Sequence, residues 1–213
     1  MHNAGISFFL LQPAASVFTG LKIKLRRPIM NETMQNIFNR RSIRNFKSDR
    51  LSSEQLQQLA QTALASPTGM NQQSWHFAFV TNQELITKVN DAAFASFKRE
   101  NQQDIIERMK KRHESIFYGA PLVVFISMPK SNDNLIDAGI AVMNLAIAAQ
   151  SMGLGSCIIG LAGAAFSGRV KDDLKNELEF PPCHEFAISV AIGYPAMDKE
   201  PHDMRPEKVT FIK

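Results

Sequence analysis

Residues 121–152 read PLVVFISMPKSNDNLIDAGIAVMNLAIAAQSM, and this stretch decides the class of fold. Its first part, residues 121–127, is a continuous apolar run with β-branched side chains, which predicts a strand buried on both faces. Its second part, residues 133–152, is rich in Ala, Ile, Leu and Met and is apolar almost all round. A helix of that composition lies in a core or at a subunit interface.

Helices and strands alternate irregularly on both sides of this stretch. A capping box formed by Ser52 and Gln55 starts a helix that Pro67 and Gly69 end. The remaining helices are expected at residues 32–39, about 84–95, about 99–116 and 166–178. The remaining strands are expected at residues 76–81, 155–160, 185–193 and 209–212. The mixed order, without an internal repeat, predicts a single α+β domain over residues 31–213.

Residues 1–30 differ from the rest of the chain in charge. They hold four of the 24 Lys and Arg residues and none of the 20 acidic ones, so the body is neutral. A nucleic-acid-binding surface would place its positive excess on the folded domain, and we expect no nucleic-acid partner. In residues 1–30 the charges follow the apolar run 6–11, the reverse of a secretory signal. We expect an extension outside the fold; a transit-like or surface-binding segment is the alternative.

The sequence lacks the motifs of side-chain catalysis. No apolar run approaches the roughly 20 residues of a membrane span, so no membrane partner is expected. Cys157 and Cys183 form neither a CxxC pair nor a His-Cys cluster, which predicts no metal site and a reducing, cytoplasmic compartment. There is no Walker A loop, GxSxG, HExxH or helix-opening GxGxxG. We therefore name no catalytic residue and expect a cofactor to supply the chemistry.

Residues 40–44, RRSIR, place three guanidinium groups and a hydroxyl within five positions. Forked guanidinium donors beside a hydroxyl suit a phosphate monoester. Arg205, near the C-terminus, could close on the same anion. The alternative is a solvated arginine cluster at the surface.

Residues 66–77, SPTGMNQQSWHF, form a polar turn between a helix and a strand. The amides and hydroxyls of this loop could hydrogen-bond a flat heterocycle rich in nitrogen and oxygen. The alternative is an ordinary connector in which Trp75 fills the core.

Taken together, the chain resembles the FMN-dependent nitroreductase family over residues 31–213. Five features occur in the family's order: RRSIRNF, ASPTGMNQQSWHF, GAPLVVFI, a long helix ending in GLGSCIIG, and AIGYPA followed by a lone Arg-Pro. The resemblance implies a mixed, mainly antiparallel sheet flanked by helices, and an intertwined homodimer in which the long central helix packs against its mate.

The resemblance also implies a single cofactor site. The positions that match the grip on the FMN phosphate and ribityl chain are Arg40, Arg41, Ser42 and Arg44, with Arg205 as a late phosphate ligand. Those that match the loop laid by the second subunit against the flavin ring are Pro67, Thr68, Gly69 and Asn71. Ile159 and Gly160 match the backbone beside the flavin N5 edge, where some members have Glu in place of Ile159.

The implied activity is transfer of hydride from NAD(P)H through FMN to a small electron-poor acceptor such as a nitroaromatic or a quinone. Two alternatives remain. One is a reductase on the same scaffold with a specialised acceptor, an unsaturated carbonyl or a halophenol. The other is a flavin-binding protein without turnover.

Overall fold

A four-stranded antiparallel sheet with strand order β1-β2-β4-β3 forms the centre of the fold. The computed structural model describes residues 30–131 and 135–212. The strands are β1 (His76–Val80), β2 (Leu122–Pro129), β3 (Gly155–Ile159) and β4 (His184–Gly193). The helices are α1 (Glu32–Asn39), α2 (Ser53–Leu64), α3 (Gln83–Arg99), α4 (Gln103–Arg112), α5 (Ile136–Ser151) and α6 (Lys171–Glu177). The α+β prediction is confirmed.

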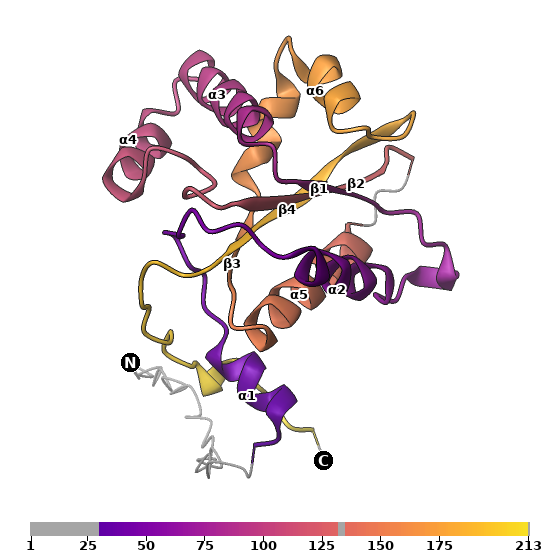
Figure 1. Cartoon of the computed structure of the whole chain (residues 1–213), viewed down its shortest axis with the longest axis vertical. Coiled ribbons are helices and arrows are strands. Elements are labelled where there is room, and N and C mark those ends of the chain that lie inside the picture. The colour runs from indigo at the N-terminus through magenta and orange to yellow at the C-terminus, as the bar shows by residue number, and fades with distance from the viewer. Residues whose placement is uncertain (1–29, 132–134, 213) are drawn as a thin grey trace, which may run out of the picture. The chain divides into compact units, whose positions relative to one another are not determined.

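Helices cover both faces of the sheet, with α2 and α5 on one side and α3, α4 and α6 on the other (Figure 1). Successive residues of a strand point to opposite faces, and β2 follows that rule. Leu122 and Val124 pack with α2 and α5, whereas Val123 and Phe125 pack with α3 and α4. All four side chains are fully buried, so the prediction of a strand buried on both faces is confirmed.

Local sequence signals explain where the elements begin. The Ser52 side chain accepts from the N–H of Gln55, and the Gln55 side chain accepts from the N–H of Ser52, which is the predicted capping box. Asn82 caps α3 through its side-chain oxygen, which accepts from two backbone N–H groups of the first turn. The predicted helix over residues 133–152 corresponds to α5; residues 133 and 134 lie outside the described residues.

The helix predicted at about 84–95 is longer and ends at Arg99, and three other predicted elements differ from the structure. The helix predicted at 99–116 is shorter, because Asn101 adopts a positive φ of 53° before α4 and the extended backbone of His113 ends it. The helix predicted at 166–178 is divided: a 3-10 helix, Leu161–Ser167, is followed by extended Gly168 and then by α6. The strand predicted at 209–212 is wrong, because these residues are exposed and pair with no strand among the described residues.

Residues 31–213 form one compact unit. The extension predicted for residues 1–30 lies outside the described residues except for Met30. No helix in the described ranges is long and apolar enough to cross a membrane.

Candidate functional site

The RRSIR segment follows α1 in extended conformation and lies beside the edge strand β3. Ser42 pairs in parallel with Ser156, and the N–H of Ile43 donates to the Ser156 carbonyl at 2.9 Å. Further along, the N–H of Lys47 donates to the Tyr194 carbonyl at 2.9 Å. The segment is therefore fixed to the end of the sheet between β3 and the chain that leaves β4.

Close approach of this segment requires glycine at the start of β3. A Cβ on Gly155 would lie 2.8 Å from Cγ1 of Ile43, a distance that real Cβ atoms do not show. The missing side chain lets Ile43 enter the core, where it is 7% exposed. Gly155 thus sets the depth of the segment, and with it the position of the flanking arginines.

Several polar atoms at this junction are buried without a hydrogen-bond partner. They are Nε of Arg40, Nε of Arg41 and the hydroxyl oxygen of Ser156. None of the ion pairs within residues 30–131 and 135–212 involves Arg40, Arg41 or Arg44. Buried donors without partners are costly, and guanidinium groups without a carboxylate suit an external anion. Of these groups, the Arg40 guanidinium and the Ser156 hydroxyl fit a phosphate group.

Burial and three arginines act in opposite directions on the neighbouring thiol of Cys157. Burial raises the pKa of Cys157, and the charges of Arg44, Arg40 and Arg112 oppose that rise. Arg112, at the end of α4, therefore acts on the same thiol as Arg40 and Arg44, two of the four predicted phosphate-binding arginines. Cys157 itself is buried and free, as expected for a small core residue.

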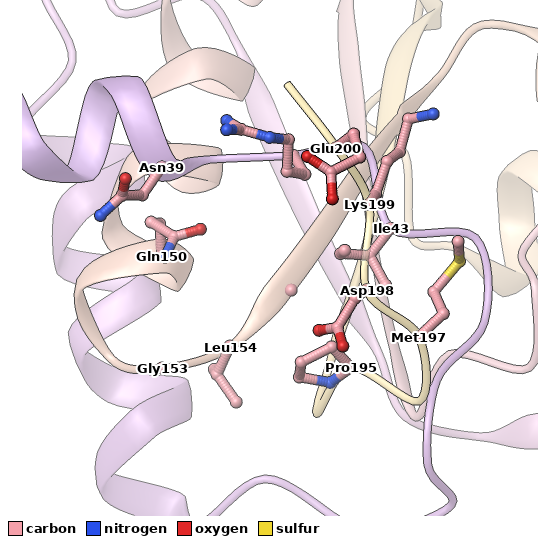
Figure 2. A pocket seen from close by; sticks show the side chains of 12 residues that line it. Asn39, Ile43, Gln150, Gly153, Leu154, Pro195, Met197, Asp198, Lys199 and Glu200 are labelled. Carbon is pink, nitrogen blue, oxygen red and sulfur yellow. The ribbon is translucent and has the colours of Figure 1, made fainter. Parts of the chain in front are cut away.

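Arg41 faces a different environment from the other predicted ligands. Side chains alternate along extended backbone, which separates Arg40 and Ser42 from Arg41 and Ile43. Arg41 and Ile43 line a hollow of about 310 Å³ between α1, α5 and residues 195–200. Figure 2 shows the α1 and α5 side of this hollow facing the chain that carries Asp198 and Glu200. Arg41 also donates to the carbonyls of Phe38 (2.6 Å) and Arg40 (2.9 Å).

The predicted ring-binding loop is a folded turn joining α2 to β1. The N–H of Asn71 donates to the Thr68 carbonyl at 3.1 Å, and the N–H of Gln73 donates to the Thr68 hydroxyl at 2.9 Å. Pro67, Gly69 and Asn71 are exposed. Trp75, which follows, is 7% exposed and packs in the core with α2 and α5.

The other predicted site residues lie at two separate places. Ile159 ends β3, is 5% exposed, and its carbonyl accepts from the Ser189 hydroxyl at 2.8 Å. Gly160 is exposed directly after it. Arg205 is exposed on the chain before the 3-10 turn Pro206–Lys208, and no ion pair in the described part of the protein involves it. The structure therefore does not bring Arg205 onto a shared side-chain partner with Arg40.

Three residues of the region escaped the sequence prediction. Ser156 carries no signal of its own within GLGSCIIG, and Arg112 belongs to a run of basic residues typical of a solvated face. The sequence did contain a signal for Asp137, because it is an acidic residue within an apolar helix. Within the described residues, no group of three or more His, Cys, Asp or Glu side chains could hold a metal ion.

The structure is an α+β domain in which unpartnered guanidinium and hydroxyl groups lie at the edge of an antiparallel sheet. The sequence profile of the Nitroreductase family matches residues 37–194, and the chain belongs to that family.

Two solved structures and one relative illustrate the similarity. A nitroreductase from Desulfitobacterium hafniense DCB-2, solved with bound FMN, is 33% identical, with a TM-score of 0.84 over 87% of this chain and 100% of that chain. A nitroreductase from Bacteroides fragilis NCTC 9343 shares the fold at 24% identity, with a TM-score of 0.80 over 86% and 100% of the two chains. The FMN reductase (NADPH) of Bacillus subtilis strain 168 is 29% identical over 182 residues, 78% of this chain and 67% of its own.

Proposed function

We propose that this protein is an FMN-dependent oxidoreductase that uses NAD(P)H to reduce small electron-poor acceptors. The observation that carries the proposal is the set of unpartnered donors beside β3, in a chain of the nitroreductase family. The D. hafniense structure, 33% identical, holds FMN, which supports the same cofactor here.

The phosphate end of FMN would be held by residues of the fixed segment. Arg40 and Ser42 lie on one face of it, with Arg44 two residues further on, and the buried Arg40 Nε has no partner within the described protein. A phosphate oxygen there would satisfy that donor and the Ser156 hydroxyl. Arg205 would reach the same anion only if its exposed segment closes over the site. We include Arg205 because its position in the sequence matches the late phosphate-binding arginine of the family.

The ring end would be held by the second group of residues. FMN when bound supplies two-electron hydride chemistry, which explains why no side-chain nucleophile or base is needed. Gly160 leaves the backbone after β3 open to a flat ligand, and the apolar Ile159 places no charge there. The loop from Pro67 to Asn71 is largely exposed, and the side-chain NH2 of Asn71 can donate to the ring of a flavin.

A homodimer is part of the same proposal. Apolar side chains are exposed on α1, at the start of α5 and near the C-terminus; they are Met34, Ile37, Phe38, Leu135, Ile136, Val209, Phe211 and Ile212. Exposed apolar side chains in this number favour burial against a second copy. Two free cysteines support a reducing, cytoplasmic location.

Reconstitution tests the function. The purified protein is loaded with FMN, desalted and titrated anaerobically with NADH and with NADPH while the flavin absorbance is followed. We expect stoichiometric flavin and bleaching by at least one of the two nucleotides. A nitroaromatic, a quinone and free FMN, the last included because of the FMN reductase relative, are then compared as acceptors. If the protein binds flavin but neither nucleotide bleaches it, the protein is a flavin-binding protein without turnover. If it does not take up FMN, the proposal is refuted.

A further inference from the structure

Asp137 is a buried acid in the first turn of α5, far in sequence from the predicted flavin site. It is 4% exposed and is the only buried carboxylate among residues 30–131 and 135–212. Its two oxygens accept from the backbone N–H of Gly69, at 3.2 and 3.3 Å. A carboxylate is buried at a cost, so this contact with the loop needs an explanation.

The loop that Asp137 contacts has a strained backbone. Met70, Asn71 and Gln73 adopt positive φ angles of 53°, 54° and 48°, in the left-handed region that side chains other than glycine rarely enter. Met70 is 93% exposed, so burial of its side chain does not stabilise this conformation. Strain of this kind persists where the surroundings hold it and is concentrated at ligand sites.

Hydrogen bonds inside the loop fix its shape but not its orientation. The Gln73 side chain donates to the side-chain oxygen of Asn71 at 2.9 Å, and the Thr68 hydroxyl accepts from the N–H of Gln73.

The contact from Asp137 to Gly69 instead joins the strained turn to α5. A second contact lies at the base of the loop, where the side-chain amide of Asn144, on α5, donates to the Ser66 hydroxyl at 3.0 Å. Both contacts therefore join the loop to α5.

We propose that Asp137 is a positioning residue that holds the Thr68–Asn71 turn in the orientation that contacts the flavin ring. The inference rests on the proposed function, because it assigns that turn to the ring of the cofactor. It adds a residue of α5 that does not itself touch the cofactor. Loss of the carboxylate should therefore weaken binding at the ring end and leave the phosphate end unchanged.

The test compares affinities for FMN and for riboflavin, which lacks the phosphate. Asp137→Ala should weaken both ligands by a similar factor of about ten or more, the worth of a hydrogen bond to a charged group. Asp137→Asn keeps an acceptor for the Gly69 N–H and should restore binding to within about threefold of the wild type. Asp104→Ala is the matched control: it removes an acid from the first turn of α4 and should change neither affinity.

A second variant removes the same hydrogen bond from the loop side, in case Asp137→Ala does not fold. Gly69→Pro deletes the N–H at the start of a 3-10 turn, and the extended Thr68 (φ −134°, ψ 154°) is compatible with a following proline. It should weaken both flavins as Asp137→Ala does. In the double variant, the second change should add little to the first.

Three results would overturn the inference. The first is wild-type riboflavin affinity in folded Asp137→Ala or Gly69→Pro. The second is an equal loss of flavin affinity in Asp137→Asn and Asp137→Ala, and the third is an equal loss of affinity in Asp104→Ala. Hydrogen exchange of the loop peptide in the flavin-free protein measures the anchor separately. Faster exchange in Asp137→Ala is expected, and unchanged exchange would refute the anchor. A wild-type protein that binds neither flavin would refute the proposed function, whatever the exchange shows.

Discussion

Replacement of Arg40 by alanine tests the phosphate site most directly. The Arg40 Nε is buried without a partner in the flavin-free chain, and the residue forms no ion pair within the described ranges. Its removal therefore breaks no ion pair there, and the free energy of unfolding of the flavin-free protein should change little. The loss of binding affinity should be confined to FMN, whose phosphate would accept a hydrogen bond from the guanidinium group.

The magnitude follows from the type of bond. A hydrogen bond to a charged group is worth about 1.5–3 kcal/mol, which corresponds to a rise of about 10- to 150-fold in the Kd for FMN. Riboflavin lacks the phosphate, so its Kd should rise by less than about threefold. Fluorescence titration with each flavin measures both values.

The matched control is Arg50→Ala, which removes an exposed arginine outside the RRSIR segment. It changes the net charge of the protein by the same amount as Arg40→Ala, so it separates a direct contact from a general electrostatic effect. Neither Kd should change in this variant. Equal weakening of the two flavins by Arg40→Ala would show that Arg40 is not a phosphate ligand.

Four further outcomes are expected. Gly155→Ala places a Cβ 2.8 Å from Ile43 and should lower the free energy of unfolding by about 1–3 kcal/mol, measured by urea denaturation. Ser52→Ala removes half of the capping box and should cost about 1 kcal/mol, whereas Ser53→Ala, one residue later, should cost less. Burial and the nearby His76 lower the pKa of His184 below 6.5, so near and below that pH the unfolded state binds more protons than the folded state. The free energy of unfolding should therefore fall as the pH drops from 6.5 through the pKa of the folded state. The His184→Asn variant should show a weaker pH dependence. Deletion of residues 1–30 should change neither flavin content nor activity, and a truncated protein that fails to fold would contradict this.

The parts of the fold that the sequence predicted well are those where one local signal dominates. The apolar run of β2 and the capping box of α2 are complete within a few residues, and the structure has both. The helix predicted at 166–178 was wrong because its apolar spacing continues across Gly168, whose extended backbone interrupts it. The strand predicted at 209–212 has strand-like composition but no partner among the described residues. Pairing depends on chain that is distant in sequence, and composition does not report it.

The candidate site shows the same division between local and distant information. The spacing of RRSIR predicted a cluster of donors, but it did not show that extended backbone directs Arg41 into a separate hollow beside residues 195–200. Nor did the spacing predict that Ser156 lies beside Ser42, because Ser156 belongs to a strand more than a hundred residues away in the sequence. In the proposed site, the phosphate side is built on backbone fixed to the sheet, whereas the ring side is a strained turn joined to α5 through Asp137 and, at its base, through Asn144. The two sides should therefore respond to different variants: Arg40→Ala should separate FMN from riboflavin, and Asp137→Ala should weaken both alike.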